Sequence, residues 1–129
     1  MPRNIDLTEA EWTLMEQLWD APGQTGRALT DALHAKTSWA RSTTLTLLRR
    51  LTEKGAVRTE VRDGMHVYFP AVSREDAAAR QTRDLLGRVY HGSLSLLVSA
   101  MTREEALSKA EIDELYAILD EMEAKQGDA

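Results

Sequence analysis

The chain has 129 residues, with 16 Lys and Arg against 21 Asp and Glu, 43% hydrophobic residues and no Cys. This length suits one domain or two small lobes with a hydrophobic core, and the absence of Cys excludes disulfides, thiolate zinc sites and Cys nucleophiles. No apolar run approaches the roughly 20 residues that cross a bilayer, and the first residues lack the apolar core of a secretory signal, so we expect a cytoplasmic protein without a membrane partner.

The charges are unevenly distributed along the chain. Residues 1–75 carry ten basic and ten acidic side chains, whereas residues 76–129 carry six basic and eleven acidic ones. Within the first part, residues 36–62 hold seven basic side chains and two acidic ones. A basic cluster followed by an acidic segment predicts two lobes with different partners; a solvated surface is the alternative reading of the same counts.

Three helices are predicted in the first part of the chain from the spacing of its apolar side chains. The first follows a capping box at Thr8 and runs to about Trp19. The second covers about residues 27–35, and the third lies within residues 38–55, where Gly55 suits a left-handed C-cap. The side chains expected to be buried along these helices are Trp12, Met15, Leu18, Trp19, Ala28, Leu29, Leu33, Leu45, Leu47, Leu48 and Leu51.

A β-hairpin is predicted after the third helix. Residues 57–62 alternate between apolar and polar side chains, which is typical of a strand. Asp63–Gly64 is a strong hairpin-turn signal, and residues 65–69 form the returning strand before Pro70. Three helices followed by such a wing describe a winged helix-turn-helix, which we place at residues 1–72. The apolar side chains expected to give the hairpin its structural role are Val57, Val61, Val67 and Phe69.

Three more helices are predicted after the wing. They cover residues 73 to about 90, 93–101 and 108 to about 125, and His91–Gly92 separates the first two. The fold class is therefore mainly α with a small β-hairpin: a winged helix-turn-helix followed by an α-helical lobe over residues 73–129. The last helix repeats apolar residues with the spacing of an a/d seam, which either folds back on its own chain or pairs with a second chain.

The third predicted helix has a polar side on which Ser, Thr and Arg predominate. Arg binds guanine through two hydrogen bonds in the major groove, and Thr offers a hydroxyl and a methyl group to thymine. A solvated helix face is the alternative, but Ser and Thr are poor helix formers and so favour a purpose beyond folding. We therefore predict a helix that reads double-stranded DNA. The candidate DNA-binding residues are Arg41, Ser42, Thr43, Thr46, Arg49 and Arg50, together with Arg62 on the wing.

The wing itself has two possible roles. Arg62 is expected near its tip, where it would contact a phosphate group or the minor groove. A hairpin that only supports the helical core is the alternative, and for His66 this structural role is favoured.

Catalytic motifs are absent from the sequence. It contains no P-loop, no nucleophile elbow and no dinucleotide fingerprint, and its three His lack metal-ligand spacing. We therefore expect no enzyme activity, no cofactor and no metal site.

Homodimerisation is predicted for the second lobe. DNA sites are commonly palindromic and read by dimers, which favours a second chain as the partner of the last helix. The acidic charge of residues 76–129 suits a lobe that stays away from phosphate groups. The candidate dimerisation residues are Leu94, Leu97, Ile112, Leu115, Leu119 and Met122.

Several motifs occur together in one order along the chain. They are Leu7-Thr8-Glu9-Ala10-Glu11-Trp12, Leu18-Trp19, the run from Trp39 through Thr43-Thr44-Leu45-Thr46-Leu47-Leu48-Arg49-Arg50-Leu51 to Lys54-Gly55, Tyr68-Phe69-Pro70-Ala71-Val72-Ser73 and Gly92-Ser93-Leu94. In this order and spacing the sequence resembles the penicillinase-repressor family, the BlaI/MecI/CopY group of bacterial transcriptional repressors, over nearly its whole length.

The resemblance implies a homodimer that binds a palindromic operator upstream of an antibiotic-resistance or stress gene. Family members commonly release DNA when a sensor-protease pathway cleaves their second lobe. The staphylococcal repressors have an Asn-Phe cleavage bond where this chain has Ala100-Met101, so we carry no cleavage site over. The copper-responsive branch uses paired C-x-C motifs, and this chain has no Cys. The alternatives are a winged-helix regulator controlled by a small ligand, and a winged-helix adaptor that binds protein.

Overall fold

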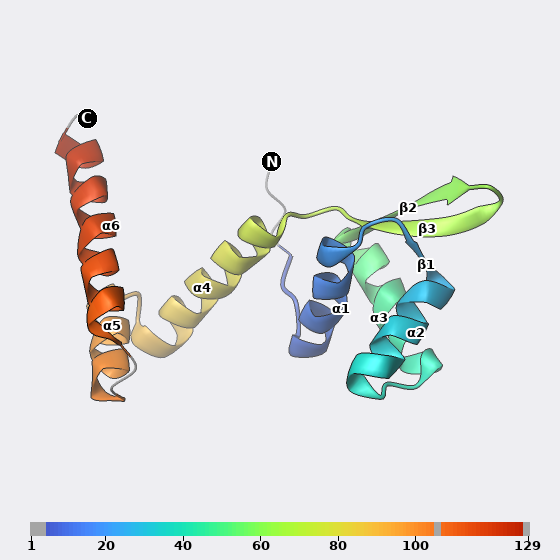
Figure 1. The fold of residues 1–129 in the computed structure, drawn as a ribbon, viewed down its shortest axis with the longest axis horizontal. Helices are drawn as coiled ribbons and strands as arrows, with labels where there is room; N and C mark the ends of the chain where they lie inside the picture. The colour runs from blue at the N-terminus through green and yellow to red at the C-terminus, as the bar shows by residue number, and fades with distance from the viewer. Residues whose placement is uncertain (1–4, 105–106, 128–129) are drawn as a thin grey trace. The chain divides into compact units, whose positions relative to one another are not determined.

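The computed structural model describes residues 5–104 and 107–127, and within them the chain forms six helices and three strands (Figure 1). It separates into two compact units, residues 1–84 and 85–129, and helix α4 crosses the boundary between them. The described residues confirm the predicted fold class, because a winged helix-turn-helix with one small sheet is followed by helices alone.

The first unit is built on three helices and a wing. Its elements, in chain order, are α1 (Glu9–Asp20), β1 (Gln24–Thr25), α2 (Gly26–Thr37), α3 (Arg41–Lys54), β2 (Val57–Arg62), β3 (Met65–Pro70) and the first part of α4 (Arg74–Tyr90). The end signals read from the sequence are confirmed. Thr8 and Glu11 form both hydrogen bonds of a capping box before α1, and Gly55 ends α3 with a φ of +85°.

The wing belongs to a three-stranded antiparallel sheet in the order β1-β3-β2. The Asp63–Gly64 turn joins β2 to β3, and the register places Arg58 opposite Phe69. The sequence does not predict β1, because two residues show no periodicity. This strand is defined by its pairing with β3, which only the folded chain brings beside it.

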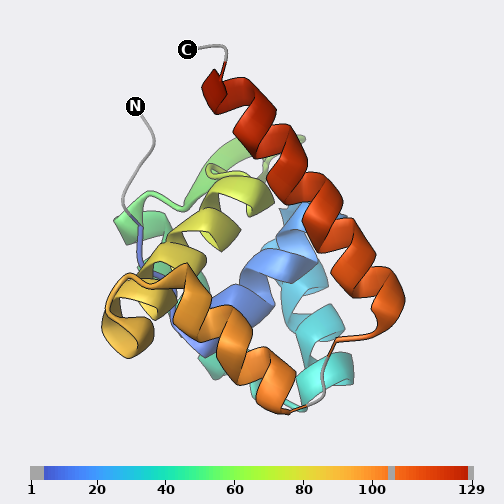
Figure 2. The same ribbon diagram turned by 90° about the vertical axis from the view of Figure 1, so that its left-hand side faces the viewer.

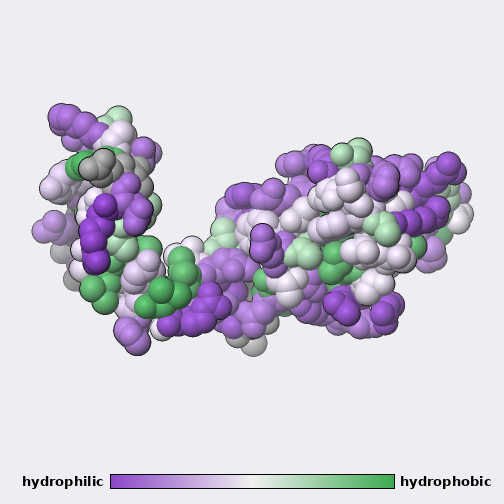
Figure 3. Space-filling view, turned by 90° about the horizontal axis from the view of Figure 1, so that it is seen from below, coloured by the Kyte–Doolittle hydropathy of each residue, from purple (hydrophilic) through white to green (hydrophobic). Residues whose placement is uncertain are grey.

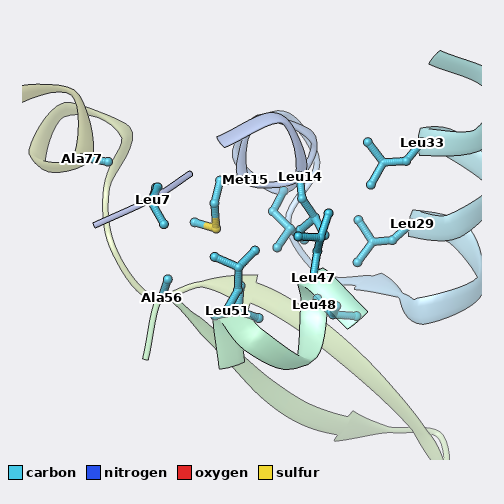
Figure 4. Close-up of a cluster of buried hydrophobic side chains, with 12 residues drawn as sticks. Leu7, Leu14, Met15, Leu29, Leu33, Leu47, Leu48, Leu51, Ala56 and Ala77 are labelled. Carbon is cyan, nitrogen blue, oxygen red and sulfur yellow. The ribbon is translucent and has the colours of Figure 1, made fainter. Parts of the chain in front are cut away.

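The core of the first unit lies between α1, α2, α3 and the base of the wing (Figure 4). Trp19 packs against this core, and its indole N–H donates a hydrogen bond of 2.9 Å to the carbonyl oxygen of Val72. That bond ties α1 to the segment that follows the wing. The largest fully buried apolar side chains are Leu14, Met15, Leu18, Leu29, Leu33 and Leu51, of which all but Leu14 were expected from the sequence.

The predictions for three positions are wrong. Ala28 and Leu45 were expected to be buried and Val61 to pack within the hairpin, but all three side chains are exposed. Ala28 lies in the first turn of α2. Leu45 is 42% exposed on the flank of α3 that faces the wing, near Tyr68, and α3 turns Thr44 into the core instead. Val61 is 63% exposed because it lies in the outer half of the hairpin, beyond the reach of the core.

The second unit contains the end of α4, then α5 (Leu94–Arg103) and α6 (Lys109–Gly127), as Figure 2 shows. His91 and Gly92 have φ values of +52° and +80° and end α4 as predicted. The Ser93 hydroxyl caps α5 by accepting a hydrogen bond of 3.2 Å from the Leu96 amide. No residue of this unit is buried within 85–104 and 107–127, and green hydrophobic side chains reach its surface in Figure 3.

Candidate nucleic-acid interface

Helix α3 presents a polar side opposite its buried side. Thr44, Leu47, Leu48 and Leu51 face the core, so at 100° per residue the row farthest from the core is Ser42, Thr46, Arg49 and Glu53. Thr43 and Arg50 lie beside this row, and Arg41 lies in the first turn. The six predicted α3 residues are therefore brought together on one helix; Thr46 is half-exposed and the others are exposed.

The cations on α3 differ in their partners. The guanidinium group of Arg49 lies 3.6 Å from the carboxylate of Glu53, one turn further along the helix. Within the described part of the chain, Arg41 and Arg50 form no ion pair, so their guanidinium groups are available to an external acceptor. An Arg with free donors is what bidentate recognition of guanine or phosphate requires.

The turn before α3 fixes where that helix begins. Ser38 ends α2 in the left-handed region, with a φ of +63°, and its amide donates 2.9 Å to the carbonyl oxygen of His34. The ring nitrogen Nδ1 of His34 lies 3.0 Å from the carbonyl oxygen of Trp39. Trp39 packs against the core, so the turn is anchored on both sides. Helices α2 and α3 thus form a helix-turn-helix, in which the anchored turn fixes the position of α3.

The wing holds an ion cluster that sequence reasoning missed. The carboxylate of Glu60 accepts a hydrogen bond from Arg58 and another, of 3.0 Å, from Arg62. Both guanidinium groups lie over the ring of Phe69, at 4.4 Å and 4.9 Å from its centroid. The hydrogen bonds from Arg58 and then Arg62 lower the pKa of Glu60. Alternation along β2 could have revealed this cluster, because it puts the three charged residues on one face.

The other face of the wing turns toward α3. His66 and Tyr68 lie there, and with Leu45 and Arg49 they line a notch between the hairpin and the helix. The predicted wing residue Arg62 lies on the opposite face, so the structure does not bring it together with the polar side of α3.

An ion pair with one buried partner, the carboxylate of Glu11, holds α1 against the end of α3. Glu11 is only 2% exposed, and its carboxylate oxygen Oε1 accepts hydrogen bonds from Lys54 Nζ at 2.6 Å and from the Thr8 amide at 2.9 Å. Burial alone would raise the pKa of Glu11, but the Lys54 hydrogen bond, the Thr8 amide and the Lys54 charge together lower it. Lys54 Nζ also donates 3.0 Å to the carbonyl oxygen of Asp6.

The second unit carries an exposed apolar surface where dimerisation residues are predicted. Leu97 is half-exposed, and the other five predicted residues are 36–55% exposed. Leu94, Leu97 and Leu115 line a groove between α5 and α6, together with Val98, Met101 and Ile118, which were not among the predicted dimerisation residues. The remaining predicted residues, Ile112, Leu119 and Met122, lie on α6 outside the groove lining.

Within 5–104 and 107–127, no group of three or more His, Asp or Glu side chains is placed to hold a metal ion. No helix of that part of the chain combines the length and the apolar composition that crossing a membrane requires.

Together, the three-helix core, the wing and the polar side of α3 define a winged-helix protein of the regulator type. The family comparison agrees with this class and is more specific. The penicillinase repressor family matches residues 7–121, which include parts of both units, and the chain belongs to this family. Its members are transcriptional repressors and not enzymes.

Individual relatives are similar over nearly their whole length. The chain is 30% identical to the penicillinase repressor of Bacillus licheniformis over 121 residues, covering 94% of each chain. It is 31% identical to the transcriptional regulator BlaI of Mycobacterium tuberculosis over 128 residues, covering 98% of this chain and 92% of the relative.

One solved structure adds a complex with DNA. The monomeric form of Bacillus licheniformis BlaI in complex with the blaP half-operator is similar to this chain with a TM-score of 0.53 and 25% identity. The similarity covers 59% of this chain and 93% of that one.

Proposed function

We propose that this protein is a transcriptional repressor that binds a palindromic DNA operator as a homodimer. The observation that carries the proposal is the polar side of α3, where Ser, Thr and Arg side chains stand exposed on a helix that the core and the wing hold in place. A helix of this kind fits the major groove, which is wide enough to admit it. The BlaI complex with a half-operator supports the proposal, because that protein has a similar fold and belongs to the same group.

Within this proposal the seven predicted residues have two roles. Ser42, Thr43, Thr46 and Arg50 face base edges, and Arg49 is shared between bases and backbone. Arg41, in the first turn of α3, and Arg62, on the wing, contact phosphate groups. Phosphate contacts orient the protein, whereas base contacts select the sequence.

The second unit supplies the dimer interface in this proposal. On α6, the apolar arc runs from Ile118 through Leu115 and Leu119 to Tyr116, and at 100° per residue it is about 160° wide. Helix α5 faces only the part that lines the groove. Exposed apolar patches of this kind mark protein interaction sites, and a second copy of α5 and α6 would cover both the groove and the adjoining face.

The proposed repressor acts in the cytoplasm on a resistance or stress gene, with residues 1–72 on the operator and residues 73–129 in the dimer. A half-operator bound by one BlaI chain implies a full operator for two. A sensor-protease pathway that ended repression would first have to open α5, because Ala100–Met101 lies inside this hydrogen-bonded helix.

Selection of bound duplexes from a random pool tests the proposal. The full chain should enrich one palindromic sequence, whose half-sites lie about one helical turn or a multiple of it apart. Enrichment of a single unrepeated site would contradict binding as a dimer. Failure to retain any duplex, even at low salt, would contradict DNA binding and favour the adaptor that binds protein. A ligand that raises the unfolding temperature and lowers operator retention would favour the ligand-controlled regulator.

A further inference from the structure

The ion cluster on the wing uses both of its cations internally. Glu60 Oε1 accepts a hydrogen bond of 3.0 Å from Arg62, and Glu60 Oε2 accepts one from Arg58. The three side chains are 36–59% exposed, so the cluster lies at the surface where a partner can reach it. Its net charge is only +1, although the wing contributes two guanidinium groups to it.

Arg62 is directed away from the tip of the wing. Its Cα lies opposite Met65, next to the turn, whereas Phe69 lies opposite Arg58. Four residues along a strand span about 13 Å. The guanidinium group of Arg62 nevertheless lies 4.9 Å from the centroid of the Phe69 ring. The side chain therefore folds back along the strand toward Glu60, and the turn itself presents the acidic Asp63.

We propose that Glu60 weakens the binding of the wing to DNA. Its carboxylate competes with DNA phosphate groups for Arg58 and Arg62 and so lowers the affinity for duplexes of arbitrary sequence. This inference rests on the DNA binding proposed above. A phosphate group accepts the same guanidinium donors as a carboxylate, so one can replace the other. A phosphate that approaches both Arg side chains also meets the negative charge of Glu60, which opposes it.

The competition should depend on the DNA sequence. On the operator, base contacts from α3 hold the backbone beside the wing, so a phosphate is present at high effective concentration and displaces the carboxylate. On a duplex of arbitrary sequence α3 does not fix the backbone in this way, and Glu60 keeps the two Arg side chains. Glu60 thus widens the difference between specific and non-specific binding.

The test compares Glu60→Gln with a matched control, Glu16→Gln. Glu16 pairs at 3.5 Å with Arg74, which lies over the ring of Trp12, so the control removes the same charge from a similar cluster on another surface. Binding of the full chain to a random-sequence duplex and to the selected operator is measured by fluorescence anisotropy over a salt series. Glu60→Gln should bind the random duplex about 3- to 10-fold more tightly, as expected for two released surface pairs.

Three further results decide the inference. The salt dependence of Glu60→Gln on the random duplex should steepen by about one or two phosphate contacts, and its operator affinity should change less. The gain should disappear when Arg58→Ala and Arg62→Ala are added. A gain in affinity that survives those two changes overturns the inference. So does a Glu60→Gln protein whose affinity for the random duplex equals that of Glu16→Gln or is lower than that of wild type. In each case operator binding still supports the proposed function. Absence of duplex binding in every protein overturns both.

Discussion

Replacing Lys54 by Met should destabilise the first unit, because it leaves the Glu11 carboxylate buried without its cation. Breaking a fully buried ion pair costs about 3–5 kcal/mol. Lys54 is 37% exposed and Glu11 is 2% exposed, so solvent screens one partner and we expect about 2 kcal/mol. For a domain of this size that loss corresponds to a fall in Tm of roughly 10 °C.

Tryptophan fluorescence during denaturant unfolding measures this change directly, because Trp12, Trp19 and Trp39 all lie in the first unit. The matched control is Lys36→Met, which removes an exposed Lys whose Nζ donates 2.6 Å to the neutral side chain of Gln17. Equal losses of stability in Lys54→Met and Lys36→Met would show that the Glu11–Lys54 pair does not stabilise the fold. Adding Glu11→Gln to Lys54→Met should recover part of the loss, because no unpaired charge then remains buried.

The pH dependence of Lys54→Met follows from the direction of the Glu11 shift. A carboxyl group whose pKa is lowered by folding stabilises the folded state above its ordinary pKa of 4.5, and this contribution is lost as the pH falls through the folded pKa. The difference between wild type and Lys54→Met should therefore be full at pH 7 and shrink on acidification, as Glu11 becomes protonated. A difference that grows toward pH 4 would contradict the assignment.

Three further predictions concern α3 and α6. Thr44 is fully buried, and its hydroxyl has no hydrogen-bond partner among the described residues. Thr44→Val should therefore raise the free energy of unfolding by about 1 kcal/mol in the same denaturation assay. A lower free energy of unfolding would show that the hydroxyl forms a hydrogen bond in the folded protein. Arg50→Ala should weaken operator binding by about 1–3 kcal/mol and relax base preference at one position, whereas equal weakening on every duplex would assign Arg50 to the backbone. Leu119→Asp should give a folded monomer in light scattering, because dimer formation would desolvate the new charge. Its operator affinity should fall more than its non-specific affinity. An unchanged dimer would place the interface elsewhere.

Local signals carried most of the fold from the sequence. Some residues favour a particular backbone conformation by themselves and so mark it in the sequence. Such signals are the Thr8 capping box, Gly55 and the Asp63–Gly64 turn, and each is present in the structure. β1 has no such signal, because it is defined by pairing with a strand some forty residues away. The consecutive Leu and Thr residues around position 45 fit the helical period in more than one rotation, and only packing against α1 and α2 turns Thr44 inward.

The candidate site was predictable where it lies on one helix. The polar side of α3 follows from helical geometry, so its residues could be named without tertiary contacts. The wing was not predictable to the same depth. A position near the tip of the hairpin suggested that Arg62 reaches outward, but its guanidinium group finds Glu60 and Phe69 on the same strand face. Such choices depend on side-chain conformation, which periodicity does not specify.

The most direct test of the account is the mass of the complex with a symmetric operator duplex, measured by light scattering at micromolar concentration. We predict two chains per duplex. We also predict a steep loss of affinity when five base pairs are inserted between the half-sites, because the insertion rotates one half-site by about half a helical turn relative to the other. A single chain bound to the full operator with undiminished affinity, unaffected by the insertion, would contradict the account.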